Sequence, residues 1–187
     1  MLRSPPATIE AGSAAPLRRA VRRRLPAALG IALAVGAALP AARADSLSRG
    51  AAALDHGNHL RAVRELSPLA ARGNPRALGL LGFMYEHGFG VPQAYDAAFD
   101  LYCQGATRGD PFAQAMLGLM YDKGHGAHQD FIQAYKWLDL AVARSQGHAR
   151  EIYTRLRNAV ASKMSRDEII VGQRLALSWL PGAPAYP

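Results

Sequence analysis

The sequence has one cysteine, Cys103, and only 7% of its 187 residues are aromatic. A single thiol excludes an intramolecular disulfide framework and a cysteine-based zinc site. The chain also lacks the G-x-S-x-G, H-E-x-x-H, Walker and C-x-x-C patterns, and no acid–base pair stands out. Half of the residues are hydrophobic, which is typical of a globular protein. We therefore expect one domain, or two small ones, with no catalytic residues, no metal and no cofactor.

Positive charge is concentrated at the N-terminus. The formal net charge is +8, but the first 44 residues contain seven arginines and one acid, Glu10. Residues 45–187 therefore carry 15 basic and 13 acidic residues, a net charge of +2. A nucleic-acid-binding protein would keep a basic face in this part of the chain, so we expect no nucleic-acid partner.

Residues 1–44 have the three parts of a secretory signal peptide. A basic region at 18–24 is followed by a 13-residue apolar run at 27–39. Thirteen helical residues span roughly 20 Å, which is shorter than the hydrocarbon core of about 30 Å. The small-x-small sequence at 42–44 predicts cleavage after Ala44. We expect a periplasmic or secreted protein without stable membrane insertion; the alternative is a buried helix.

The rest of the chain is organised by a 36-residue repeat. Residues 76–108 and 112–144 align without a gap and are identical at ten of 33 positions. An earlier half-unit fits the same frame, because Gly73-Asn74-Pro75 precedes Gly109-Asp110-Pro111 by 36 residues. A fixed period of this length indicates stacked structural units, each of which contacts its neighbours.

Each unit is predicted to form two helices. Asn74 and Asp110 are suitable N-caps, and each precedes a proline in the first helical turn. Gly88 and Gly124 are suited to end the first helix in the left-handed conformation. Glycine and alanine at the expected crossing of the two helices allow close approach. We expect about eight helices and no strand, with a degenerate first helix over 46–56.

The sequence LGxMYxxGxG occurs twice, as LGFMYEHGFG and LGLMYDKGHG. These segments resemble Sel1-like repeats, which are α/α units related to tetratricopeptide repeats. The resemblance implies an all-α fold, a short right-handed α/α solenoid of about three helical hairpins over 45–144. It also implies a non-catalytic adaptor or scaffold that binds protein partners. Ser145-Gln146-Gly147 departs from the junction sequence, so we expect the array to end there.

Residues 145–180 are predicted to form a C-terminal cap of two helices. Ser165 and Glu168 have the spacing of a capping box. Ile169, Gly172, Ala176 and Trp179 follow at helical spacing. A solenoid needs such closing helices because its end unit exposes a stacking face. We expect residues 181–187 to be disordered.

The histidines and the cysteine allow more than one interpretation. His56/His59 and His125/His128 are H-x-x-H pairs, but each lacks a third ligand in the sequence, and solvated loop histidines are the favoured alternative. Cys103 is either a small buried residue, which is favoured, or a partly exposed thiol that forms an intermolecular disulfide.

The first helix of each unit has a stripe opposite to its expected core stripe, and we predict that this stripe binds a partner. It consists of Arg76, Leu80, Phe83, His87, Phe112, Met116, Leu119 and Lys123. The resemblance implies that this face lines a concave groove. An apolar centre with cationic rims suits an extended peptide or a helix that carries an apolar anchor and an acidic neighbour. The alternative is that these residues complete the core or pack on the caps.

The resulting prediction is an exported, non-catalytic module that binds a protein or peptide partner. One alternative is an envelope-associated enzyme accessory or a protein that binds the cell wall or a small molecule. A second alternative is a structural oligomer, in which the same stripe is a self-interface.

Overall fold

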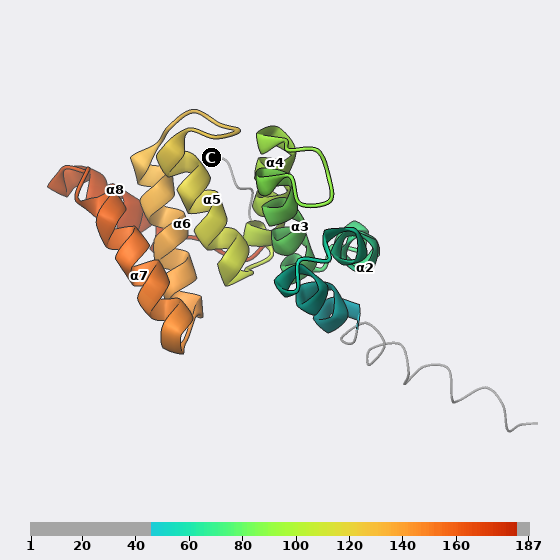
Figure 1. The fold of residues 1–187 in the computed structure, drawn as a ribbon. Coiled ribbons are helices and arrows are strands. Elements are labelled where there is room, and N and C mark those ends of the chain that lie inside the picture. The colour runs from blue at the N-terminus through green and yellow to red at the C-terminus, as the bar shows by residue number, and fades with distance from the viewer. Residues whose placement is uncertain (1–45, 183–187) are drawn as a thin grey trace, which may run out of the picture. The chain divides into compact units, whose positions relative to one another are not determined.

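The computed structural model describes residues 46–182 of the chain. The predicted signal peptide and its cleavage site lie outside these residues. Residues 46–182 form eight helices and no strand, as predicted. A helix over 46–55 is followed by α2 (His59–Ala71), α3 (Pro75–His87), α4 (Tyr95–Thr107), α5 (Pro111–Lys123), α6 (Phe131–Arg144), α7 (Gly147–Ala161) and α8 (Arg166–Leu177), as Figure 1 shows.

The first helices of the two full units, α3 and α5, begin in the same way. The Asn74 side chain accepts a hydrogen bond from the Ala77 N–H at 2.9 Å, and Asp110 accepts one from Ala113 at 2.8 Å. Both helices end at a glycine with φ 71°, as predicted for Gly88 and Gly124. The local sequence therefore sets both ends of each helix without help from the rest of the fold.

The loop between the two helices of a unit has one architecture, used twice. The Gln93 side-chain amide donates to the Glu86 carbonyl at 2.8 Å, and Gln129 donates to the Asp122 carbonyl at 2.7 Å. The donor and the acceptor of the second bond each lie 36 residues after those of the first, so the repeat extends to single hydrogen bonds. These bonds satisfy carbonyls at the C-terminus of the first helix, which have no partner within the helix.

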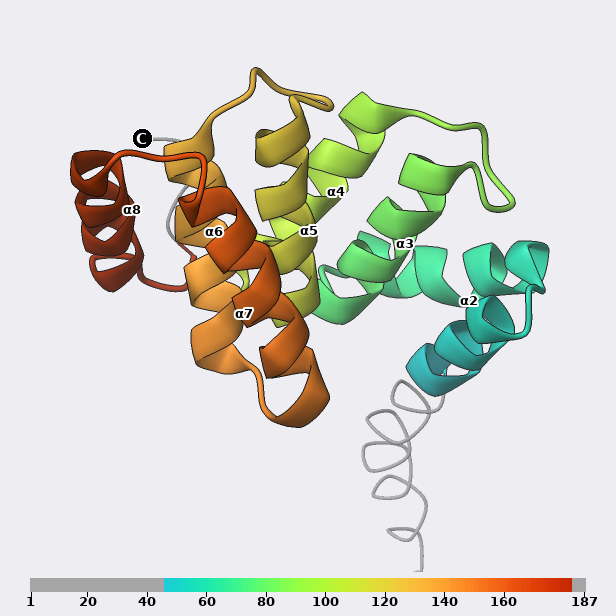
Figure 2. The same cartoon turned by 60° about the vertical axis from the view of Figure 1, so that its left-hand side comes forward.

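Each of these loops rests on the preceding unit through its second glycine. A Cβ atom at Gly90 would lie 2.9 Å from the backbone carbon of His59, and one at Gly126 would lie 2.7 Å from the backbone oxygen of Tyr95. Only glycine permits this approach, and both positions have positive φ. Consecutive units therefore stack backbone to backbone, and both loops lie at the upper edge of Figure 2.

The two helices of a unit cross at a small residue, as predicted. A Cβ atom at Gly82 would lie 2.9 Å from the Tyr102 ring, and one at Gly118 would lie 2.8 Å from Cγ of Leu138. The large side chain of the second helix thus occupies the space that the glycine leaves on the first. This complementarity gives a closely packed helical pair.

Buried side chains form two clusters along the array. The first contains residues from 53 to 84, and the second contains residues from 98 to 179. The partly buried side chains of Tyr85 and Phe112 pack against both clusters. The core is therefore continuous through the stacked units, as expected for a solenoid.

Both cap helices pack on α6. Arg157 of α7 donates to Asp139 at 2.7 Å, and Gly172 of α8 lies against the Tyr135 ring. The predicted capping box of Ser165 and Glu168 is present at the start of α8. The cap therefore covers the outer side of the last unit, on the left-hand side of Figure 2.

The chain beyond α8 returns toward the repeat units. Trp179 is buried, with its ring centroid 6.1 Å from that of Trp137. The Gly182 N–H donates to the Thr107 carbonyl at 2.7 Å, so the first two residues of the tail predicted to be disordered form an ordered turn. Residues 183–187 lie outside the described part of the chain.

Candidate functional site

The predicted binding stripe lies on α3 and α5, which contact each other along the array. Its members differ in exposure. Leu80 is buried at 8% exposure and belongs to the core. Arg76, His87 and Lys123 are exposed, and the remaining four members are partly buried. Whether these residues bind a partner stays a prediction, but Leu80 offers little surface for contact.

Arg76 is held at the point where α3 meets α5. Its guanidinium lies 4.6 Å from the centroid of the Phe112 ring and 3.8 Å from the Asp110 carboxylate. Burial raises the pKa of Asp110, while the Ala113 N–H and the Arg76 charge oppose that rise. A cation on an aromatic face is attracted by the ring quadrupole. The first turn of α3 thus presents a positioned, half-exposed positive charge.

Phe83 is the centre of a group of aromatic rings on the same face. Its ring centroid lies 4.2 Å from that of His87, 5.8 Å from that of Phe89 and 6.2 Å from that of Phe112. Phe89 also stacks on His59 at 4.5 Å. The rings come from α2, α3, the α3–α4 loop and α5, so four structural elements build one aromatic surface.

The sequence reasoning did not include Phe89 and His59 in this surface. Phe89 occupies the variable position of the G-x-G loop, and His59 was considered as a solvated loop histidine or a metal ligand. Their spacing from Phe83 has no helical period, because the loop and the preceding unit bring them in. The aromatic character of Phe89 between two glycines was the one available signal.

The α5 half of the stripe is simpler. Met116 packs against the core, whereas Leu119 is partly exposed and is in neither core cluster. Lys123, at the last turn of α5, forms no ion pair within residues 46–182. Leu119 is therefore the apolar member whose substitution disturbs the core least.

Tyr153 of α7 extends the face beyond the two repeat units. Burial raises the pKa of the Tyr153 hydroxyl, the Arg76 charge lowers it, and the Asp110 charge raises it. Tyr153 packs against the same core cluster as Phe83 and Phe112. The sequence analysis predicted a cap helix in this region but did not include Tyr153 in the binding surface.

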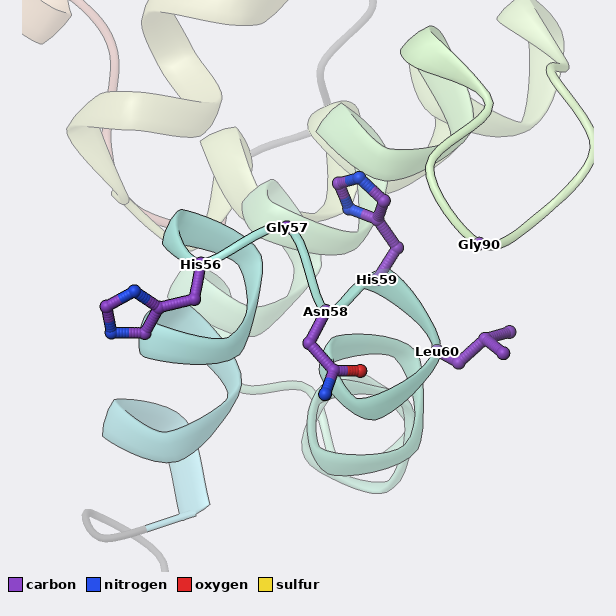
Figure 3. A pocket seen from close by; sticks show the side chains of 6 residues that line it. All are labelled: His56, Gly57, Asn58, His59, Leu60 and Gly90. Atoms are coloured by element: carbon purple, nitrogen blue, oxygen red, sulfur yellow. The ribbon is translucent and has the colours of Figure 1, made fainter.

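The histidine pairs are not joined by a third ligand in the described part of the chain. Figure 3 shows the imidazole of His56 pointing away from that of His59, which lies beside the loop of Gly90. His125 packs on Tyr95 with a centroid distance of 4.5 Å. Residues 46–182 contain no group of three or more His, Cys, Asp or Glu side chains arranged around a metal position. Cys103 is buried at 8% exposure, which agrees with the favoured alternative.

Two open hollows lie beside the loops that join the first and second helices of a unit, not on the predicted stripe. The first is lined by His56, Gly57, Asn58, His59, Leu60 and Gly90 (Figure 3). The second, of about 490 Å³, lies around Gly126 and includes the carboxylates of Asp96, Asp100 and Asp130. The two hollows share two equivalent lining positions, Leu60/Asp96 and Gly90/Gly126, and are otherwise lined by different positions of the repeat. None of the helices in residues 46–182 is long and apolar enough to cross a membrane.

Comparison with known proteins identifies the repeat. The family model described as Sel1 repeat matches residues 75–110 and 111–145. The chain is 30% identical to a Sel1 repeat protein from Oxalobacter formigenes, with a TM-score of 0.51; the match covers 63% of this chain and 92% of that chain. It is 25% identical to a protective antigen present in uropathogenic Escherichia coli strains that displays an SLR fold, with a TM-score of 0.67. That match covers 76% of this chain and 30% of the antigen. No curated protein sequence matches the chain.

Proposed function

Because the chain belongs to the Sel1 repeat family, whose members are generally protein-interaction modules and typically non-catalytic scaffolds, we propose that it binds a protein partner through the exposed parts of the α3 and α5 stripe. The surface consists of Arg76, Phe83, His87, Phe112, Met116, Leu119 and Lys123. The observation that carries the proposal is a partly exposed apolar strip between two positive charges, Arg76 and Lys123.

The chemistry of this surface defines the partner. Aromatic and aliphatic side chains that are only partly buried favour an apolar anchor residue. Arginine and lysine at the two ends of the strip favour acidic residues beside that anchor. The partner segment is therefore an extended peptide or a helix with an apolar residue and a carboxylate close to it.

A site-specific photocrosslinker tests the surface in the living cell. We would place a photoreactive phenylalanine analogue at Leu119 and, as a control, at Leu177, which is 87% exposed on α8. The expected result is one adduct from position 119 that is absent from position 177 and is lost when Lys123→Glu is added. Equal adducts from both positions, or none from position 119, contradict the proposal.

Self-association is the other outcome of this experiment. An adduct with twice the mass of the chain would show that the strip is an interface between copies, and light scattering at increasing concentration would then detect the dimer. That result would mean that the protein is a structural oligomer and not a scaffold for another protein.

Export is part of the same proposal and rests on the predicted signal peptide in residues 1–44. We expect the protein in the periplasmic or secreted fraction, with Asp45 as its first residue. Cell fractionation followed by N-terminal sequencing measures both. A full-length chain that starts at Met1 in the cytosolic fraction contradicts export and leaves the binding surface unaffected.

A further inference from the structure

Three arginines occupy the same position in three successive units. Arg72 is the C-cap of α2, Arg108 is the C-cap of α4, and Arg144 is the last residue of α6. They are 36 residues apart and all are exposed. We call these three residues the arginine edge. It lies where the second helix of each unit passes into the next unit, at the opposite end from the loop that joins the two helices of a unit.

Two of these side chains reach back over the preceding junction. The Nε atom of Arg108 lies 3.4 Å from the position of a Cβ atom at Gly73, and Nε of Arg144 lies 3.6 Å from that at Gly109. Both glycines have positive φ, of 77° and 88°. The repeat therefore places a guanidinium group next to the backbone of the preceding arginine, and the positive charges follow one another along the edge.

These guanidinium groups are held in place. Arg108 donates to the Gln104 carbonyl at 2.7 Å, and Arg144 lies 4.5 Å from the centroid of the Trp179 ring. A side chain that is already ordered loses less conformational entropy when it binds a ligand. The edge is thus preorganised at two of its three positions.

No acidic side chain neutralises the edge. None of its three arginines is in an ion pair within residues 46–182, and the acid closest in sequence, Asp110, is buried, caps α5 and lies 3.8 Å from Arg76. The C-termini of α2, α4 and α6 carry a partial negative charge that favours a cation here. This stabilises the cation only by a fraction of what a full counter-charge would. Like charges in a row repel one another, and a bound anion relieves that repulsion.

We infer that the arginine edge binds an extended acidic segment of a partner protein. The first helices of successive units, α3 and α5, are in contact, and packed helices lie about 10 Å apart. An extended chain rises about 3.3 Å per residue, so we infer a segment with a carboxylate at about every third residue. The planar guanidinium group matches a carboxylate in a bidentate pair. The Trp179 ring at this edge is buried, so it offers no platform for stacked nucleic-acid bases. The edge shares no residue with the α3 and α5 stripe and is a second surface.

Fluorescence anisotropy with labelled peptides tests this inference on the full chain. The probe is a peptide with glutamate at every third position among glycine and serine. It is compared with a peptide of the same composition whose glutamates are contiguous, and with an oligothymidylate of equal charge. The edge variant Arg72→Gln/Arg108→Gln/Arg144→Gln is matched by Arg61→Gln/Arg64→Gln/Arg155→Gln, which removes three other exposed arginines and has the same net charge.

The expected result is that the spaced peptide binds the wild type and the control variant equally and the edge variant about tenfold more weakly. Equal loss in both variants, or no binding to the wild type at low salt, overturns the inference. If the contiguous peptide binds as tightly as the spaced peptide or more tightly, the predicted spacing of the carboxylates is wrong. If the oligothymidylate does so, the ligand of the edge is not an acidic protein segment. Circular dichroism must show the same helix content for all three proteins. Because Arg144 packs on Trp179, the double variant Arg72→Gln/Arg108→Gln gives a second test, with a smaller loss expected in the same direction.

Discussion

The two full units, 75–110 and 111–145, share a loop and a helix crossing but use equivalent side chains differently. In the first unit Glu86 accepts a hydrogen bond from Tyr102 of the same unit at 2.8 Å. In the second unit the equivalent acid, Asp122, pairs with Lys163 of the cap at 2.7 Å, and Leu138 takes the place of Tyr102. The acid on the first helix therefore bonds within its own unit in one case and to the cap in the other.

A second pair of equivalent positions differs in burial. Asp100 of α4 is exposed, whereas Lys136 of α6 is buried at 7% exposure, with its ammonium group 4.6 Å from the Trp137 ring centroid. α6 is covered by both cap helices, and α4 is covered by the next unit. The glycine positions and the loop glutamine are the same in both units, whereas these equivalent side chains differ with what packs against them.

The largest expected effect comes from uncovering the second unit. Trp179→Ala removes a buried ring that packs on Trp137, and we expect a loss of about 3–5 kcal/mol in the free energy of unfolding. Urea unfolding measures it, with Leu177→Ala as the exposed control, expected within about 0.5 kcal/mol of the wild type. Hydrogen exchange should accelerate more in α6 than in α3. Equal acceleration would show that the cap stabilises both units alike.

The shared loop can be tested by two neighbouring glycines. Gly124→Ala places a side chain at positive φ, and we expect a loss of about 1–2 kcal/mol in the free energy of unfolding. It adds no clash, because the nearest neighbours of its Cβ atom lie 3.4 Å away. Gly126→Ala adds a clash at 2.7 Å with the Tyr95 backbone, and we expect about 3 kcal/mol in total. Thermal unfolding of both variants measures the difference. If the loop is equivalent in the two units, Gly88→Ala and Gly90→Ala differ in the same direction.

The interactions of the two equivalent acids should contribute differently to the free energy of unfolding. Tyr102→Phe removes a part-buried hydrogen bond to the Glu86 carboxylate, and we expect a loss of about 1.5–3 kcal/mol in the free energy of unfolding, as for a hydrogen bond to a charged group. Lys163→Met removes a more exposed ion pair with Asp122, at about 0.2–1 kcal/mol. Chemical denaturation of both variants ranks them, and Glu86→Gln combined with Tyr102→Phe isolates the pair. A greater loss from Lys163→Met would mean that the cap contact is the stronger of the two.

The smallest effect concerns Lys136. Burial lowers the pKa of its ammonium group, and Asp130 only partly opposes this. The unfolded chain therefore binds the proton more tightly, and stability rises with pH between the lowered pKa and the unfolded value near 10.4. We expect Lys136→Met to be neutral or stabilising by roughly 1 kcal/mol at pH 7 and to abolish this alkaline rise. Lys123→Met, at an exposed position, should keep the rise. A rise that persists in Lys136→Met assigns it to another group.

Much of the fold follows from local sequence. Asn74, Asp110 and Ser165 cap the helices that they precede, and Gly88 and Gly124 end helices as predicted. These interactions span four residues or fewer, so a single sequence contains all the information for them.

The candidate surface was predictable only in part. The helical period correctly placed Phe83 and Phe112 on neighbouring positions of one face, because their ring centroids lie 6.2 Å apart. It did not separate the buried Leu80 from its exposed neighbours, since that depends on how closely α5 approaches α3. It also missed Phe89 and Tyr153, which a loop and the cap bring to the face.

The sequence alone determined the repeat length, the helix ends and the family of this protein, because these depend on residues close to one another in the chain and on a period of 36. Only the tertiary structure decided which equivalent side chains are buried and where charge accumulates. A net charge of +2 in residues 45–187 predicted a balanced surface, yet stacking places Arg72, Arg108 and Arg144 along one edge. The physical reason is that a repeat gives each unit the same geometry, while burial and charge depend on what packs against it.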